Sequence, residues 1–394
     1  MKILQINSFF SVGGPPRIMN GIHDMLKREG IECKIAASRE QQYDAVNSIQ
    51  IGSKIDVYLN AIKARLFDNE GFNAKKSTQK LIKEIEEYNP DLIHLHNLHG
   101  YYINVEELFD YLKIYGKPVV WTLHDCWPIT GHCPHFSMAK CNNWISGCHD
   151  CPQKREYPKS VFMDNSPQNW KRKKNAFTKV SNMTIVCVSK WLQNIVKKSY
   201  LSQYNTRVIY NGIDLTPFKS VESSFRRRYG LEDKKILVGV AMHWLPRKGL
   251  NDYVELSKII GMDTVIVLVG LTDEQSTSMP PNIIGISATT DDQNLAEIYS
   301  SADICLNLSY EETFGLTSVE ALACGTPIIT YDQTAVPEIA EMFGMPVVKA
   351  GDIQALSRII SETPRKEHSI KTDLSCFEQE NQYRKYIELY RKLV

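Results

Sequence analysis

Short apolar runs alternate with segments of helical periodicity along the first half of the chain. Apolar runs of roughly four to eight residues, bounded by turn residues or polar side chains, predict buried strands. Four such runs are Lys2–Asn7, Glu32–Ala37, Asp91–His96 and Pro118–His124. Helical spacing follows the first run as far as Gly30, a residue suited to end a helix, and recurs in Thr78–Tyr88. This alternation predicts an α/β architecture with a parallel sheet.

The same alternation restarts in the second half of the chain. Strands are predicted at Lys235–Val240, Thr264–Val269, Asp303–Leu308 and Pro327–Tyr331. Helical spacing lies between these runs and in a final stretch, Phe377–Leu393. A chain of 394 residues also suits two domains better than one. We therefore expect a first domain at 1–205, a second at 206–375, and a final helical segment at 376–394.

Composition and charge narrow the class of protein. The apolar fraction of 43% and the charged fraction of 23% are ordinary for a globular protein. A net charge of +1 gives the whole molecule no field that would attract nucleic acid. No stretch approaches the roughly 20 continuous apolar residues of a membrane-spanning helix. The N-terminus also lacks the basic head and long apolar run of a signal peptide. The sequence thus predicts a cytoplasmic protein without a nucleic-acid partner.

An irregular insertion rich in Cys, His, Pro and Trp interrupts the strand pattern at about 126–174. Four of the ten cysteines fall in it with the spacing Cys-x7-Cys-x6-Cys-x2-Cys: Cys133, Cys141, Cys148 and Cys151. Only the last pair has the tight spacing of a zinc knuckle. A structural zinc ion is the favoured interpretation, because the insertion has no evident core of its own. Reduced thiols and disulfides are the alternatives. The other six cysteines lie mostly in apolar runs and are expected to be small buried hydrophobes.

One motif, at residues 308–327, suggests specific chemistry. Glu312 follows a predicted strand, and a predicted helix begins nearby. Helix N-termini favour phosphate, because their orphan N–H groups and the macrodipole both attract an anion. The backbone amides expected at this N-terminus are those of Phe314, Gly315 and Leu316. Glu320 falls about two turns into the helix, where a carboxylate can accept paired hydrogen bonds from the vicinal hydroxyls of a ribose.

The spacing Glu312-x7-Glu320, set in Glu-x-Phe-Gly and followed by Glu-Ala-x-Ala-x-Gly-x-Pro, resembles the signature of the family-four retaining glycosyltransferases. Enzymes of that family have the GT-B fold, in which two Rossmann-like domains face an interdomain cleft. The resemblance implies that Glu320 holds the ribose and that Glu312 approaches the hydroxyls of the donor sugar. It implies that the three amides touch the sugar or the diphosphate. It also implies that the segment 376–394 packs back on the first domain.

Two further segments match the same family. Arg247 and Lys248, followed by a glycine, correspond to the segment whose cation neutralises the donor diphosphate. Family members often carry an arginine five residues before this lysine, a position held here by His243. The second cationic role therefore stays open among His243, Arg247 and other residues. Gly13 and Gly14 resemble the glycine pair that lets the backbone approach the donor phosphate.

His124, at the end of a predicted strand, matches a family histidine that lies beside the reacting sugar. Such a histidine can exchange a hydrogen bond with the sugar or with the acceptor hydroxyl. A histidine that only satisfies backbone groups at the strand end is the alternative. The sequence has no Asp-x-Asp triplet, the usual clamp for a divalent cation, and together with Lys248 this predicts catalysis without a metal or another cofactor. The family implies retention of the anomeric configuration.

The predicted partners are a nucleotide-sugar, with UDP- or GDP-sugars favoured, and a glycan or lipid-linked glycan acceptor. The segment Trp121–Pro152 resembles a branch of these enzymes associated with colanic acid and other bacterial exopolysaccharides. Basic runs at Lys171–Lys174 and Arg226–Arg228 suggest contact with the inner face of the membrane, with a solvated helix face as the alternative. Two other functions compete with glycosyl transfer: a non-catalytic nucleotide-sugar or carbohydrate-binding protein, and a sugar-nucleotide epimerase on the same fold.

Overall fold

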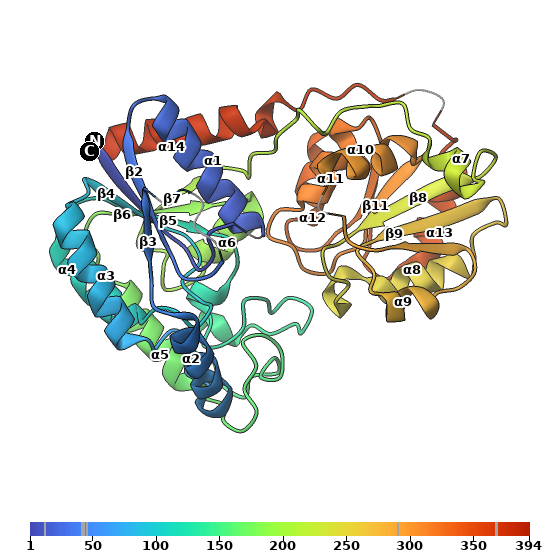
Figure 1. Ribbon diagram of the computed structural model, residues 1–394. Helices are drawn as coiled ribbons and strands as arrows, with labels where there is room; N and C mark the ends of the chain where they lie inside the picture. The colour runs from blue at the N-terminus through green and yellow to red at the C-terminus, as the bar shows by residue number, and fades with distance from the viewer. Residues whose placement is uncertain (12, 41–43, 45, 290, 367–368) are drawn as a thin grey trace. The chain divides into compact units, whose positions relative to one another are not determined.

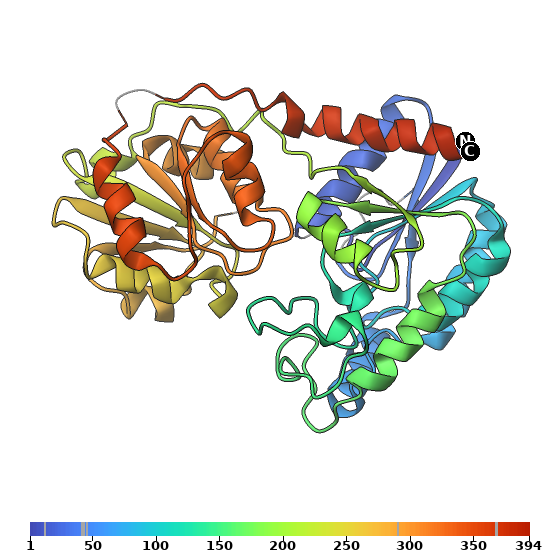
Figure 2. The same ribbon diagram turned by 180° about the vertical axis from the view of Figure 1, so that it is seen from behind.

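The computed structural model describes residues 1–11, 13–40, 44, 46–289, 291–366 and 369–394. The chain forms two compact units (Figures 1 and 2), one made of Met1–Tyr210 with Gln382–Val394, the other of Asn211–Asn381. The sequence placed the first division after residue 205. The observed division follows Tyr210, because Asn205–Val208 forms a strand that pairs with the sheet of the first unit.

The first unit is built on a seven-stranded parallel sheet with the order β3-β2-β1-β4-β5-β6-β7. Its strands are β1 (Lys2–Ile6), β2 (Glu32–Ala37), β3 (Ser48–Gln50), β4 (Leu92–Leu95), β5 (Val119–Leu123), β6 (Met183–Cys187) and β7 (Asn205–Val208). Every residue of β4, β5 and β6 is buried, which is why these strands read as continuous apolar runs. The polar edge strand β7 was not predicted, since none of its residues is buried. The predicted α/β architecture with parallel sheets is confirmed.

Helices cover both faces of this sheet (Figure 1). They are α1 (Gly14–Arg28), α2 (Lys54–Phe67), α3 (Lys75–Tyr88), α4 (Val105–Tyr115), α5 (Ser166–Phe177) and α6 (Lys190–Lys197), with short 3₁₀ turns at Trp127–Ile129 and Asn143–Ile145. On one face α1 packs over a core that includes Ile3 and Val120. On the other face Trp121 packs against Phe109 of α4 and Phe177 of α5. Adjacent residues of β5 thus serve opposite faces, as the twofold period of a strand requires.

The last helix, α14 (Gln379–Leu393), supplies part of the core of the first unit. It lies beside α1 in both views of the ribbon (Figures 1 and 2). Tyr383, Tyr386 and Tyr390 are buried in the same cluster as residues of β1 and α1. Gly21 of α1 makes room for this contact, because a Cβ there would clash with the Tyr383 ring. The close contact between this glycine and the large tyrosine ring therefore holds α14 against the first unit.

The irregular insertion is shorter than the sequence predicted. It was expected at about 126–174, but helix α5 already begins at Ser166. The buried face of α5 includes Trp170, Lys173 and Phe177, at helical spacing. The lysine-rich sequence hid this face, because a charged residue rarely occupies a buried helical position. Lys173 does so by donating from Nζ to the backbone oxygen of Trp127 at 2.8 Å.

The second unit holds a six-stranded parallel sheet with the order β10-β9-β8-β11-β12-β13. Its strands are β8 (Lys235–Val240), β9 (Thr264–Val269), β10 (Ile283–Ile286), β11 (Ile304–Asn307), β12 (Ile328–Tyr331) and β13 (Val347–Val348). Its helices are α7 (Phe225–Tyr229), α8 (Leu250–Ser257), α9 (Asp273–Thr277), α10 (Asp292–Ser301), α11 (Leu316–Ala323), α12 (Val336–Met342) and α13 (Ile353–Glu362), with 3₁₀ turns at Pro246–Lys248 and Ser375–Phe377. The core joins Leu237 and Ile266 of the sheet to Leu256 and Leu356 of the helices.

The helices are short relative to a lipid bilayer. The longest among the described residues, α1 and α14, have 15 residues each. A membrane-spanning helix needs roughly 20 apolar residues. Within the described ranges, none of the helices has the length and apolar character of a transmembrane segment.

Candidate active site

The motif around Glu312 lies on the strand–loop–helix unit β11–α11. Strand β11 ends at Asn307, and α11 begins at Leu316 with Gly315 as its N-cap. Gly315 has a φ of +96°, a left-handed conformation in which a side chain is strained. The Asn307 amide donates to the Ser318 hydroxyl at 3.1 Å, which ties the end of the strand to the first turn of the helix. The predicted phosphate-binding helix N-terminus is therefore rigidly connected to the sheet.

Glu320 lies on the second turn of α11 and is buried. Its Oε2 atom accepts a hydrogen bond of 3.0 Å from the hydroxyl of Tyr299, a fully buried residue of α10. Burial and the neighbouring Glu320 carboxylate raise the pKa of Tyr299 well above its usual value, so the phenol stays protonated and donates. A carboxylate can accept about four hydrogen bonds. The bond from Tyr299 therefore orients Glu320 without using all of its acceptor positions. The sequence did not single out Tyr299, because nothing in its spacing to Glu320 marks it.

Lys248 forms an ion pair with Glu312. Lys248 ends the 3₁₀ turn after β8, and the next residue, Gly249, has a φ of +75°. A Cβ at Gly249 would clash with the backbone oxygen of Leu308, so only glycine lets the two loops approach this closely. The side chains of Lys248 and Glu312 are 17% and 19% exposed, which leaves the pair accessible to a ligand.

The neighbouring loops are fastened to each other by backbone groups. Arg247 donates from Nη1 to the backbone oxygen of Glu311 at 3.2 Å. Its own backbone oxygen accepts from the backbone N–H of Tyr310 at 2.8 Å. The Glu312 N–H donates to the Thr334 hydroxyl at 3.0 Å. Arg247 thus positions the loop that carries Glu312. The structure brings together the predicted residues Arg247, Lys248, Glu312 and the N-terminus of α11.

In the first unit, His124 follows β5 and ends a chain of three hydrogen-bonded side chains. Its Nε2 lies 3.0 Å from Nδ1 of His96, and Nε2 of His96 lies 3.2 Å from Oε1 of Gln5. The Gln5 amide nitrogen donates to the backbone oxygen of Met19, which turns Oε1 toward His96. An amide oxygen only accepts, so a neutral His96 donates from Nε2 and accepts at Nδ1. His124 therefore donates from Nε2, and its Nδ1 carries the lone pair.

Burial keeps these histidines neutral. It lowers the pKa of His124 to about 4, although the nearby Asp125 carboxylate acts in the opposite direction. It also lowers the pKa of His96 well below the usual value, helped by the neighbouring His94 and His124. At neutral pH each ring thus carries one proton, and the hydrogen-bonded chain decides which nitrogen holds it. His124 is equipped to accept a hydrogen bond at Nδ1 rather than to act as a cation.

A second polar group lies next to His124. His99 Nε2 contacts Oδ2 of Asp125 at 2.7 Å, and its Nδ1 contacts the hydroxyl of Tyr157 at 2.9 Å. Burial would raise the pKa of Asp125, but His99 and the backbone N–H of Trp127 outweigh it and lower the pKa to about 2. Asp125 is therefore a buried, ionised carboxylate next in the chain to His124. The spacing of the chain does not mark Asp125, Tyr157 or Gln5 as site residues.

Gly13 and Gly14 lie at the N-terminus of α1, where Gly13 is the N-cap with a φ of +102°. A Cβ built at either glycine meets no atom within 4 Å. The left-handed backbone at Gly13, rather than lack of space, is what calls for glycine there. The open surroundings are compatible with a ligand close to the backbone.

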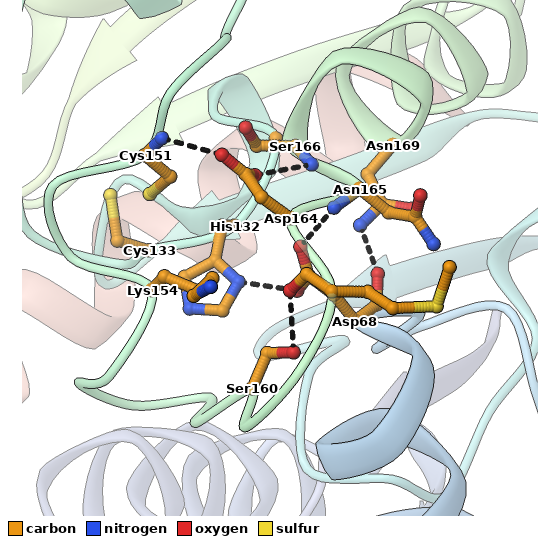
Figure 3. Close-up of polar contacts among 12 residues, drawn as sticks. Asp68, His132, Cys133, Cys151, Lys154, Ser160, Asp164, Asn165, Ser166 and Asn169 are labelled. Carbon is orange, nitrogen blue, oxygen red and sulfur yellow. Dashed lines mark hydrogen bonds and ion pairs between the residues drawn. The ribbon is translucent and has the colours of Figure 1, made fainter.

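The four clustered cysteines, Cys133, Cys141, Cys148 and Cys151, line one small cavity together with His132 and His149. A hydrogen bond from Cys133 lowers the pKa of Cys151 to about 7, and Figure 3 shows these two sulfurs side by side. Cys148 accepts a bond of 3.2 Å from the Gly131 N–H. Among the residues that the structure describes, no group of three or more His, Cys, Asp or Glu side chains is arranged to hold a metal ion. Zinc binding therefore stays a prediction.

The remaining cysteines are mostly interior side chains, as expected. Those buried are Cys33, Cys126, Cys187, Cys305 and Cys324. Cys376, in contrast, is exposed.

Two parallel α/β sheets in separate units, with a Glu-x7-Glu motif on the strand–loop–helix of the second, define a glycosyltransferase of the GT-B fold. A model of glycosyltransferase family 4 matches residues 12–217, and a model of the group 1 glycosyl transferases matches residues 221–374. The chain belongs to glycosyltransferase family 4. This assignment removes the epimerase alternative.

Individual relatives agree with the family. The putative colanic acid biosynthesis glycosyl transferase WcaC of Escherichia coli K12 is 24% identical over 378 residues, which cover 91% of this chain and 90% of that protein. Sucrose-phosphate synthase of Thermosynechococcus elongatus superimposes with a TM-score of 0.69 at 16% identity, over 100% of this chain and 98% of its own. Anabaena Alr3699/HepE, solved in complex with UDP and glucose, gives a TM-score of 0.67 at 16% identity, over the whole of both chains.

Proposed function

We propose that this glycosyltransferase moves a sugar from a nucleotide-sugar, with retention of the anomeric configuration and without a catalytic metal, to a glycan or lipid-linked glycan. The product would belong to a bacterial surface polysaccharide. The observation that supports the donor class best is the buried Glu320, which lies on the second turn of α11 and is oriented by Tyr299. A ribose held at Glu320 would direct its diphosphate toward the positive end of the helix.

The ion pair of Lys248 and Glu312 suggests how the diphosphate is received. A diphosphate carries more charge than a carboxylate, so it competes well for Lys248 Nζ. Transfer of Lys248 to the diphosphate would release the Glu312 carboxylate to accept hydrogen bonds from the hydroxyls of the donor sugar. The lysine and the helix N-terminus together oppose the negative charge that grows on the departing diphosphate. This arrangement would replace the divalent cation that an Asp-x-Asp site supplies.

The comparisons favour particular substrates. HepE binds UDP and glucose, which favours a UDP-sugar donor among the nucleotides considered. WcaC is described as a colanic acid biosynthesis enzyme, which favours an exopolysaccharide acceptor. In the first unit, the Nδ1 lone pair of His124 is suited to accept a hydrogen bond from a hydroxyl of the sugar or of the acceptor.

Thermal unfolding against UDP-, GDP-, ADP- and dTDP-sugars tests the donor proposal. A ligand at about 100 times its Kd adds about 2.7 kcal/mol, which raises the Tm by roughly 5–10 °C for a unit the size of Asn211–Asn381 that unfolds on its own. We expect a shift with UDP-sugars that Glu320→Ala abolishes. Glu341→Ala, an exposed position on α12, is the matched control and should keep the shift. A well-folded protein whose Tm responds to no nucleotide-sugar contradicts the proposal.

Release of nucleotide from the donor alone distinguishes catalysis from mere binding. Glycosyltransferases of this kind hydrolyse their donor slowly, because water can replace the acceptor. We expect slow release of free UDP that Lys248→Ala abolishes, and an α-configured product from an α-configured donor when an acceptor is present. Donor binding without any release of nucleotide would favour the non-catalytic binding protein.

We also propose that Cys133, Cys141, Cys148 and Cys151 hold a structural zinc ion. Their common cavity supports this, since four thiolates are a usual ligand set for structural zinc. Metal analysis of the purified protein should find about one zinc per chain, lowered by Cys148→Ser and unchanged by Cys376→Ser. Less than about 0.2 zinc per chain in the unaltered protein contradicts the proposal and leaves reduced thiols.

A further inference from the structure

Helix α2 carries its large apolar side chains on the outside of the first unit. Six of its residues are exposed large hydrophobics: Ile55 (71%), Tyr58 (67%), Leu59 (50%), Ile62 (36%), Leu66 (37%) and Phe67 (50%). The residues it buries are smaller or polar, namely Val57, Asn60 and Ala64. This is the reverse of an ordinary amphipathic helix, which turns its large apolar residues toward the core.

The exposed apolar residues form one continuous stripe. Successive residues of an α-helix are about 100° apart, so Ile55, Leu59, Ile62 and Leu66 fall on the same line along the helix. That line is opposite the buried side at Val57, Asn60 and Ala64. The same geometry places Lys63 on one side of the stripe and Arg65 on the other, and both are exposed. The helix thus presents an apolar ridge with a cation on each side.

A loop of the insertion extends this ridge. Val161, Phe162 and Met163 are 50%, 71% and 45% exposed. The Val161 N–H donates to the backbone oxygen of Arg65 at 2.8 Å, so the loop lies directly against the end of α2. We name the exposed apolar residues of α2 and Val161–Met163 the α2 patch. Contiguous apolar surface of this kind commonly marks an interaction site.

Buried polar contacts beneath the patch hold its two parts in place (Figure 3). Asp68, the C-cap of α2, is buried and contacts Nδ1 of His132 in the insertion. Its other carboxylate oxygen accepts from the Asn165 N–H at 2.8 Å, and its backbone oxygen accepts from the Asn169 amide. Cys151 and Ser166 both donate from their backbone N–H groups to Asp164. These hydrogen bonds therefore hold the end of α2 and the loop of the insertion in fixed positions beneath the exposed apolar residues.

The charge around the patch indicates what it binds. On α2 and in the residues 155–160 that lead into Val161, the exposed cations are Lys54, Lys63, Arg65, Arg155 and Lys159, and the exposed acids are Asp56 and Glu156. A second copy of the chain would bring two cationic rims together, which disfavours self-association. An apolar ridge flanked by lysine and arginine has the character of a helix that lies in a membrane interface, with cations at the level of anionic headgroups.

Part of each basic run that suggested membrane contact in the sequence is used within the fold, while Lys171, Lys174 and Arg227 are exposed. Lys173 is buried. Arg226 pairs with the buried Asp303, and Arg228 pairs with Glu297. Membrane contact of these runs stays a prediction, whereas the α2 patch supplies apolar area as well as charge.

We propose that the α2 patch docks the enzyme on an anionic lipid bilayer, with Leu59, Ile62 and Leu66 entering the interface. The position of the patch does not depend on which donor or acceptor is used. It gives the first unit a fixed face toward the lipid, which would suit an acceptor that is presented on a membrane.

Flotation of the full chain with lipid vesicles, without any donor, tests the proposal. We expect binding to vesicles of phosphatidylcholine with phosphatidylglycerol, and much weaker binding to phosphatidylcholine alone. Leu59→Ser, Ile62→Ser and Leu66→Ser should each lower the partition coefficient by about tenfold. Lys63→Gln and Arg65→Gln should each lower it by about fivefold at low salt.

Matched controls separate the patch from general effects. Ile114→Ser removes an 82% exposed apolar side chain from α4 of the same unit, and Lys80→Gln removes an exposed cation from α3. Both should bind vesicles like the unaltered protein, and all variants should keep the Tm. The proposal is overturned if the unaltered chain does not float, or if Ile114→Ser weakens binding as much as Ile62→Ser. It is also overturned if the chain is a dimer in light scattering that Ile62→Ser dissociates. None of these outcomes bears on donor binding.

Discussion

The candidate site residues of the two units are brought together in different ways. In the second unit, Lys248 and Glu312 follow the adjacent parallel strands β8 and β11, and Glu320 comes eight residues later on the same segment. In the first unit, Gln5 lies on β1, and His96 and His124 follow β4 and β5. The arrangement in the second unit places charged groups together, whereas the arrangement in the first unit decides which nitrogen of His124 carries the proton. Substitutions should therefore affect the two sites to different degrees and through different measurements.

Removal of the cation from the second unit should have the largest effect. Lys248→Ala removes the ion pair with Glu312 and a charge that would stabilise the departing diphosphate. We expect kcat to fall by about a hundred- to a thousandfold, as for the loss of one strong stabilising donor. Steady-state kinetics of donor hydrolysis measures it. Lys349→Ala, exposed in the same unit, should keep the full rate, and an equal loss there would mean that the charge acts nonspecifically.

Acid should weaken the first unit through its buried histidines. The pKa of His124 is about 4 in the folded protein and about 6.5 when unfolded. Between these two pH values the unfolded chain binds more protons than the folded one. The contribution of the neutral His124 to the free energy of unfolding is therefore complete above about pH 6.5 and is lost as the pH falls toward 4. Its size is about 3 kcal/mol. Urea unfolding from pH 7 to pH 4.5 measures it, and His124→Asn should flatten the dependence. Equal slopes in both proteins would show that His124 is not the titrating group.

Loss of the acceptor at Gln5 should change where protons lie rather than how much charge is present. Gln5→Met removes the oxygen that holds the proton on Nε2 of His96, so His124 no longer has one enforced tautomer. We expect kcat to fall by about tenfold, less than the roughly hundredfold or more that loss of a proton-transfer group costs, because the His124 ring itself is kept. Nitrogen-15 NMR of labelled histidine reports the tautomer of His124 directly. An unchanged His124 spectrum in Gln5→Met would mean that the hydrogen-bonded chain of Gln5, His96 and His124 does not set the tautomer of His124.

The smallest effect is expected at Tyr299. Tyr299→Phe removes one hydrogen bond to Glu320 and leaves the packing of α10 intact. Donor affinity should fall by about fivefold, the size of one hydrogen bond, with kcat little changed. Calorimetric titration with the donor nucleotide measures the Kd. A fall in kcat at unchanged Kd would mean that Glu320 acts in the transition state rather than in holding the ribose.

The fold could be predicted closely where strands are buried on both faces. The predicted bounds of β8 and β9 agree with the observed ones, because their apolar runs are continuous. The edge strand β7 could not be predicted from Asn-Thr-Arg-Val, and α5 was hidden by the burial of Lys173. Periodicity also does not reveal which side of a helix faces the core, and on α2 the larger apolar residues face outward.

The same contrast applies to the site residues. Glu312 and Glu320 can be predicted as site residues from the sequence, because the motif lies within one strand–loop–helix segment. Gln5 and Tyr299 were missed, because each reaches its partner only through the order of strands or the packing of helices. The spacing of residues along the sequence does not reveal a residue whose role depends on the order of strands in the sheet.

The closing helix has a consequence for how the protein is made. The core of the first unit includes Tyr386 and Tyr390, and the buried His94 of β4 contacts the Tyr390 hydroxyl at 2.6 Å. These residues are synthesised after all of Asn211–Asn381. Domains commonly fold in the order in which they leave the ribosome. Here the second unit can complete its core first, while the first unit waits with an apolar surface uncovered until residues 382–394 emerge.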